Sequence, residues 1–95
     1  MYRHESLELH KITRSPAFRL VPTEHADKQM VARNVTAFEA EKVAKSGSVV
    51  MIETDPDGSE RWRVAGRDAD GRRIEIVVEP LLPAMLVLVT VIRVG

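Results

Sequence analysis

The sequence predicts one α+β domain in which two short N-terminal helices pack on a four-stranded antiparallel β-meander. Three observations support this prediction. A chain of 95 residues can build one modest core, a capping box marks a helix near the middle of the chain, and the apolar residues alternate with a strand-like period from residue 48 onward. We place this domain at residues 18–95. Residues 1–17 carry no firm period and form an N-terminal arm of undecided structure.

The domain begins with a short strand and a first helix. Residues 18–21 are an extra strand candidate, stopped by the proline that follows. Thr23 can cap a helix over residues 24–33, because its hydroxyl can accept a free N–H of the first turn. Acidic residues in that turn and Arg33 in the last turn complement the helix dipole. Asn34 suits the left-handed position that ends a helix.

The second helix has clearer boundaries. Thr36 and Glu39 form a capping box, and Gly47 follows a helical pattern over residues 37–46. Apolar residues recur there at the one-sided spacing of an amphipathic helix. The apolar stripe comprises Ala37, Ala40, Val43 and Ala44. This helix should therefore pack across the sheet.

Four strands follow, over residues 49–54, 60–67, 72–79 and 85–93. The two turns that separate the first three strands both read Asp-x-Asp-Gly, which suits tight turns. The residues after them do not supply the further ligands of a calcium loop, so we interpret both as hairpin turns. The last strand is apolar on both faces. We therefore expect it to be an interior strand, covered by helices on one side and by loops or the N-terminal arm on the other.

The composition excludes several classes of function. The 14 basic and 14 acidic residues balance, so a nucleic acid or other charged partner would have to meet a local patch. The chain has no cysteine, which excludes disulfides, thiol nucleophiles and cysteine-based zinc sites. Its three histidines lie in unlike segments and form no metal-ligand pattern, and there is no phosphate-binding loop or dinucleotide fingerprint. We expect no metal and no cofactor.

The terminal segments favour a cytoplasmic protein. Residues 1–8 are charged and lack the apolar centre of a secretory signal. The most apolar stretch, residues 81–94, is interrupted by Pro83 and Thr90 and is shorter than the about 20 residues of a membrane-spanning helix. We expect no membrane association and interpret this stretch as a buried strand.

The first helix carries one candidate for acid–base chemistry. His25, Lys28 and Gln29 share a helical face with Ala32, and Arg33 lies at its edge. An imidazole in this position would stand beside cations that can stabilise an oxyanion. The alternative is a surface or half-buried histidine with a structural role.

A row of arginines is the second candidate. Arg61, Arg63 and Arg67 alternate with apolar residues of the second predicted strand, so they share one face of the sheet. Guanidinium groups suit phosphate recognition, because each offers a planar fork of donors and keeps its charge. The alternative is a solvated face on which these arginines pair with Glu75 and Glu79 of the next strand.

The order and spacing of these segments resemble a known family. The segments are His25-Ala26-x-x-x-Met30-x-x-Arg33-x-Val35-Thr36, a helix closed by Gly47, Trp62-Arg63-Val64-Ala65-Gly66-Arg67-x-x-x-Gly71-Arg72, Ile76-Val77-Val78 and Val89-Thr90-Val91-Ile92. Over residues 18–94 the chain resembles the bacterial family domain of unknown function 4258. More remotely it resembles the RelE-like and BrnT-like ribonuclease toxins of toxin–antitoxin pairs. Their shared BECR-type fold, N-terminal helices followed by a curved four-stranded antiparallel sheet, agrees with the prediction from the residues.

The resemblance implies metal-independent RNA cleavage, in which a base activates a ribose 2′-hydroxyl to attack the adjacent phosphate. It implies RNA as the substrate and a cognate antitoxin as a protein partner. His25 would then act as the acid or base, while cationic side chains hold the phosphate and neutralise its charge. The resemblance implies Arg33, Arg63 and Arg72 as charge stabilisers, and Lys28, Arg61 and Arg67 as substrate contacts.

The residues also fit a non-catalytic protein-interaction module. Such a module would bind a partner protein or form a homodimer through its sheet face or an exposed edge strand. The absence of a rare catalytic motif favours this alternative, as does the apolar turn over residues 81–85, which a monomer would struggle to cover. A small-molecule pocket between helices and sheet is a third interpretation, with generic support.

Overall fold

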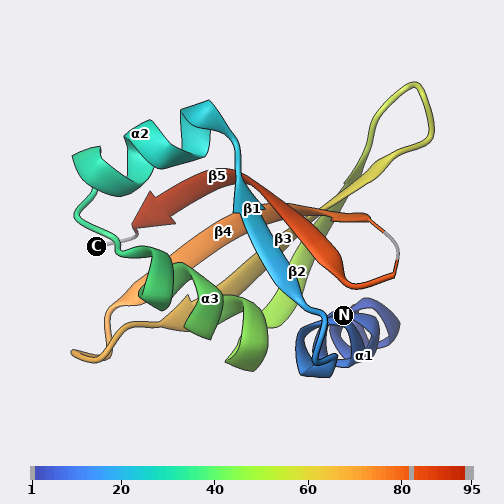
Figure 1. Ribbon diagram of the computed structural model, residues 1–95, viewed down its shortest axis with the longest axis horizontal. Helices are drawn as coiled ribbons and strands as arrows, with labels where there is room; N and C mark the ends of the chain where they lie inside the picture. The colour runs from blue at the N-terminus through green and yellow to red at the C-terminus, as the bar shows by residue number, and fades with distance from the viewer. Residues whose placement is uncertain (1, 82, 94–95) are drawn as a thin grey trace.

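Three helices cover one face of a five-stranded sheet in the computed structural model, which describes residues 2–81 and 83–93 (Figure 1). The strands lie in the order β1-β5-β4-β3-β2. In chain order the elements are α1 (Arg3–Arg14), β1 (Arg19–Pro22), α2 (Glu24–Ala32), α3 (Ala37–Ser46), β2 (Ser48–Thr54), β3 (Glu60–Arg67), β4 (Arg73–Leu81) and β5 (Met85–Arg93). The prediction of an α+β fold is confirmed.

The prediction of a four-stranded antiparallel sheet is wrong, because β1 joins the sheet as a fifth strand. It lies parallel to β5, with Leu20 opposite Leu86, while the other neighbouring pairs are antiparallel. The residues indicated the strand but not its partner, which lies at the other end of the chain. A parallel pair needs a long crossover; here the crossover contains α2, α3 and the three remaining strands.

The N-terminal arm forms a helix, α1, so the prediction of two helices is also wrong. Leu9 is fully buried in the common core. The hydroxyl of Ser6 accepts the Val49 N–H at 2.9 Å, and Nε2 of His10 donates to the Gly47 carbonyl at 2.9 Å. These contacts anchor α1 to the start of β2. The helix turns few apolar residues inward, and its buried residues are Leu9 and Thr13.

The two predicted helices are confirmed, with their caps. The hydroxyl of Thr23 accepts a backbone N–H in the first turn of α2 at 3.1 Å. Asn34 takes the left-handed conformation, with φ of 54°. Thr36 and Glu39 make both hydrogen bonds of the capping box of α3, each 3.0 Å long. These caps fix where α2 ends and α3 begins, and so set the angle between the two helices.

Gly47 follows the last residue of α3, at a position where a larger residue would not fit. Its φ of −81° is available to any residue. A Cβ there, however, would lie 2.5 Å from the Ala65 carbonyl oxygen and 2.6 Å from that of Val43. The absence of a side chain therefore lets the end of α3 pass directly over β3.

The strands of the meander lie close to their predicted positions. β3 and β5 have the predicted bounds, β2 starts one residue earlier, and β4 runs from Arg73 to Leu81 instead of over residues 72–79. β4 continues because Pro80 and Leu81 pair with Leu86 and Met85 of β5. Leu82 of the predicted apolar turn, and Val94 of the last apolar stretch, lie outside the described residues.

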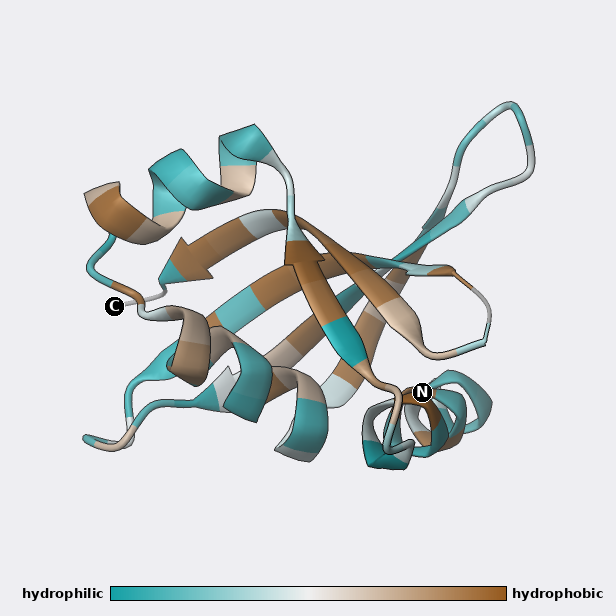
Figure 2. Cartoon of the chain, in the orientation of Figure 1, coloured by the Kyte–Doolittle hydropathy of each residue, from teal (hydrophilic) through white to brown (hydrophobic). Residues whose placement is uncertain are grey.

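β5 is an interior strand as predicted, but the N-terminal arm does not cover the second face of the sheet as expected. α1 packs against α3 and β2, so all three helices lie over the same face (Figure 1). The core lies between this face and the helices, and much of the sheet is hydrophobic in Figure 2. Its sheet residues include Val64, Ile74, Ile76, Val78, Leu86, Leu88 and Val91. Within the described residues the opposite face carries no helix, and no helix is both long and apolar enough to cross a membrane.

Candidate functional site

The structure places the predicted catalytic residues on two different faces of the sheet. α2, which carries His25, packs against β5 and β1 on the helix-covered face. Arg61 and Arg63 of β3 alternate with Trp62 and Val64, whose side chains belong to the core under the helices. The guanidinium groups therefore point to the uncovered face. The sheet separates the imidazole from the arginines that were expected to assist it.

The residues of α2 form no enclosed site around the imidazole. His25, Lys28 and Arg33 are exposed, whereas Ala26 is fully buried against the sheet. Lys28 pairs instead with Glu24 of the preceding turn at 3.3 Å. An exposed ring on the outer side of a surface helix fits the structural alternative better than general acid–base catalysis, which needs a positioned substrate.

The arginines of the uncovered face are paired with carboxylates, as the alternative prediction described. Nη1 of Arg63 lies 3.7 Å from Glu75, and Nε of Arg61 lies 3.8 Å from Glu79. A second carboxylate, that of Asp55, lies 3.5 Å from the same Nε of Arg61. These contacts pair both arginines with carboxylates of the sheet and its turn, and Glu75 also accepts a hydrogen bond from Nε of Arg73 at 2.8 Å. They leave this face as a ladder of ion pairs, not as a cationic surface for phosphate.

The remaining two arginines of the predicted set lie beside and within the β3–β4 turn, because Arg67 ends β3 and Arg72 directly precedes β4. Arg67 donates through Nη1 to the Gly71 carbonyl at 2.8 Å, and the Arg72 side chain is exposed. Neither lies on α2 with His25. The prediction of RNA cleavage therefore has no single site in this geometry, and it stays a prediction from the resemblance.

Asp68 holds that turn, which confirms the hairpin interpretation. Its Oδ1 accepts the N–H groups of Asp70 and Arg72 at 2.9 and 2.8 Å, and its Oδ2 lies 3.4 Å from Nη2 of Arg93. Burial raises the pKa of Asp68, but the Arg72 and Asp70 N–H groups and the Arg93 charge outweigh it, so this pKa lies below its ordinary value. Arg93 also donates to the Asn34 carbonyl at 3.2 Å and so links the turn to the α2–α3 connection.

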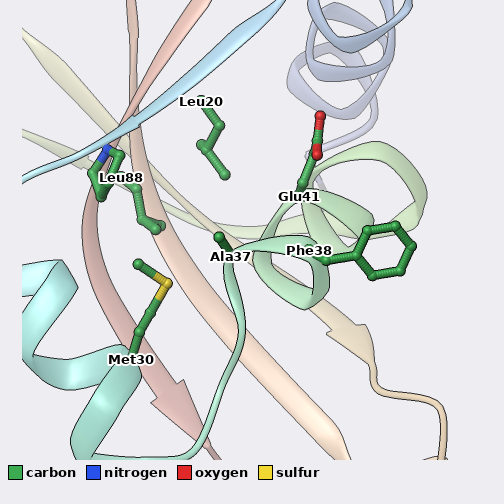
Figure 3. Close-up of a pocket in the computed structure, with 7 residues that line it drawn as sticks. Leu20, Met30, Ala37, Phe38, Glu41 and Leu88 are labelled. Carbon is green, nitrogen blue, oxygen red and sulfur yellow. The ribbon is translucent and has the colours of Figure 1, made fainter.

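An apolar groove between α2 and α3 is the feature that reasoning from the sequence missed. It has a cavity volume of about 260 Å³ and lies over β1 and β5 on the helix-covered face (Figure 3). It exists because α2 packs on β5 and β1 while α3 packs on β3 and β4, which leaves part of the sheet uncovered between them. The lining residues are Leu20, Pro22, Met30, Ala37, Phe38, Glu41 and Leu88.

Two large apolar side chains stand exposed beside this groove. Phe38 of α3 is 75% exposed, and its ring points away from the cavity (Figure 3). Val31 of α2 is 84% exposed and lines an adjoining hollow that shares Met30 and Ala37 with the groove. The sequence did contain a signal, because Phe38 lies off the apolar stripe of its helix and so had to face outward.

A side-chain hydrogen bond holds one wall of the groove in place. β1 pairs only with Met85–Leu88, so the second half of β5 has a free edge beside α2. There the amide oxygen of Gln29 accepts the Val91 N–H at 2.8 Å. The hydroxyl of Thr23 donates to the Val89 carbonyl at 3.4 Å. α2 thus takes the place of a longer β1 and is fixed against the sheet edge.

Comparison with known proteins gives one match. The model of a family described as "Domain of unknown function (DUF4258)" matches residues 23–93. No curated protein and no solved structure matches the chain. The matched residues begin at the cap of α2, so α1 and β1 precede them. Among the described residues no group of three or more His, Asp or Glu side chains is arranged to hold a metal ion.

Proposed function

The chain belongs to the family described as Domain of unknown function (DUF4258), and we propose that it is a self-associating protein-interaction module, not an enzyme. In this proposal the groove between α2 and α3 receives Phe38 of a second copy of the chain. The observation that supports it is the exposed Phe38 ring beside an apolar cavity that its own ring does not fill (Figure 3).

The juxtaposition of Phe38 and the groove suits a two-fold symmetric dimer. In such a dimer the same patch of both copies meets itself, so a projecting side chain and its cavity must lie side by side on each copy. Phe38 lines the groove and projects from its rim, which meets this requirement. A cavity of about 260 Å³ can take an aromatic side chain, and buried aromatic side chains dominate the energy of protein interfaces.

The edges of the sheet are poorer candidates for association. The outward edge of β1 ends at Pro22, which has no N–H to donate to an added strand. At the other edge, the Val49 N–H of β2 is already bound by Ser6 of α1, and the register of β2 shifts between Val49 and Met51. Such irregularities protect edge strands from pairing with a second chain. The groove therefore supports association better than either edge.

Sedimentation of wild type and of Phe38→Ser tests this proposal. Burial of one aromatic side chain contributes about 1.5–3 kcal/mol. Phe38→Ser would remove two such contributions from a symmetric dimer, one from each copy. We expect wild type to dimerise across a concentration series and Phe38→Ser to weaken the dimer at least about a hundredfold. Wild type that stays monomeric throughout would overturn the proposal and leave the groove to a different partner.

Met51→Ser is the matched control. Met51 is exposed like Phe38, but it lies opposite Arg63 of β3, on the uncovered face of the sheet. We expect this variant to dimerise like wild type. A dimer that Met51→Ser dissociates and Phe38→Ser does not would place the interface on the uncovered face and contradict the proposal.

A further inference from the structure

α1 carries a stripe of basic residues on its solvent side. Arg3, Lys11 and Arg14 are exposed, with the exposed Leu7 between the first two. Their spacing of four, four and three residues places them in one row along the helix. At 1.5 Å per residue the row is about 16 Å long. We call these four residues the basic stripe.

This stripe is a local positive patch on a neutral chain. Residues 1–22 contain four Lys and Arg against two Asp and Glu, whereas residues 23–95 contain ten against twelve. Six of the eleven other Lys and Arg residues pair with a carboxylate, for example Lys28 with Glu24 and Arg63 with Glu75. Within residues 2–81 and 83–93, no carboxylate lies within 4.0 Å of the cationic groups of the basic stripe.

Helix stability does not account for the whole stripe. Lys11 and Arg14 lie in the last turn of α1, where cations complement the helix dipole. Arg3 lies in the first turn, where the dipole opposes a cation, so it has no such role. A hollow with a volume of about 460 Å³ adjoins the C-terminal half of the stripe and is lined by Leu7, His10, Lys11, Arg14 and Ser15.

We propose that the basic stripe of α1 binds the phosphodiester backbone of nucleic acid. A row of cations on one helix face meets the needs of phosphate contacts, which require charge and donors and no apolar anchor. Such contacts carry no base specificity. The stripe therefore supplies the local patch that a formally neutral chain needs in order to meet a polyanion.

The same residues fit other anionic partners less well. A helix that lies on a membrane must insert its apolar face, and the buried Leu9 shows that the apolar face of α1 is packed into the core with α3 and β2. A protein interface needs large apolar or aromatic anchors at its centre, whereas Leu7 is the one large apolar side chain in the stripe. The stripe therefore fits a phosphate backbone best.

Fluorescence anisotropy tests this proposal with two labelled probes, a mixed-sequence single-stranded RNA and a DNA duplex, over a salt series. The variant combines Arg3→Gln, Lys11→Gln and Arg14→Gln. We expect it to bind at least about tenfold more weakly at low salt. Its salt slope should fall by about 0.7 per lost cation on single strands and about 0.9 on the duplex. Wild-type binding of either probe, together with the weaker binding and smaller salt slope of the variant, supports the proposal. The probe that binds more tightly shows whether RNA or DNA is the preferred nucleic acid.

A control variant with the same loss of charge combines Lys42→Gln, Lys45→Gln and Arg73→Gln, which lie on α3 and β4. We expect it to bind both probes like wild type. Failure of wild type to bind at low salt would overturn the proposal, as would an equal loss in the control variant. Poly-glutamate that competes as well as RNA would overturn it too, in favour of an acidic protein partner. Circular dichroism verifies that both variants are folded.

Discussion

The amide oxygen of Gln29 accepts the backbone N–H of Val91 at 2.8 Å and so joins α2 to the free edge of β5. This hydrogen bond takes the place of a strand ladder where β1 has ended. The same hydrogen bond holds α2 in place as one wall of the apolar groove. Met30, the next residue of the helix, lines that groove.

Gln29→Ala should destabilise the fold, because it leaves the N–H of the buried Val91 without its partner. We expect a loss of about 1–3 kcal/mol, which corresponds to a decrease in Tm of at least about 4 °C for a domain of this size. Thermal unfolding followed by circular dichroism measures it. Lys28→Ala, on the exposed side of the same helix, should change Tm far less. Equal effects would show that Gln29 does not hold α2.

Gly47→Ala should destabilise the fold by steric overlap. Its Cβ would meet two backbone carbonyl oxygens, those of Ala65 and Val43, and backbone cannot move aside cheaply. We expect a cost of about 1–3 kcal/mol, as for other overpacked sites. Gly58→Ala is an informative comparison, because a Cβ at Gly58 meets nothing but its φ of +88° is strained. Urea denaturation measures both. An unchanged midpoint for Gly47→Ala would contradict the close approach of α3 and β3.

Asp68 should make stability depend on pH in the acid range. Its pKa in the folded protein lies below the ordinary value of 3.8, so its stabilising effect is present above that value and is lost as pH falls through the folded pKa. Urea denaturation at neutral and acid pH should show Asp68→Asn less stable than wild type at pH 7, with the difference shrinking at low pH. A difference that grows on acidification would contradict this assignment.

The separation of His25 from the sheet arginines predicts that the purified protein leaves RNA intact. Incubation of partner-free wild type and His25→Ala with RNA should give the same electrophoretic pattern over a range of pH. Binding through α1 would retard RNA without cutting it. Cleavage by wild type that His25→Ala lowers by about a hundredfold, the usual contribution of a general acid or base, would restore the ribonuclease prediction.

Local signals in the sequence predicted most of the elements. The capping box of Thr36 and Glu39, the left-handed Asn34 and the alternation in β3 each depend on neighbouring residues, and each is confirmed. The parallel pairing of β1 with β5 depends on residues at opposite ends of the chain, so no local signal could predict it.

The site was harder to predict than the fold. Alternation correctly placed Arg61 and Arg63 on one face, and the predicted pairing with Glu75 and Glu79 is present. Alternation does not show whether the arginines lie on the same side of the sheet as His25. That depends on which face of the sheet the helices cover. The groove could not be predicted from the sequence for a related reason. It is a gap between two helices, and its walls come from four separate elements.

Isotope-filtered NMR on a mixture of ¹³C-labelled and unlabelled protein tests the central claim most directly. It detects contacts between copies and ignores those within one copy. We predict intermolecular contacts from the Phe38 ring of one copy to the Met30 and Leu88 methyl groups of the other. A dimer in which the Phe38 ring has no intermolecular contact, or a sample that stays monomeric, would contradict the claim that a second copy fills the groove.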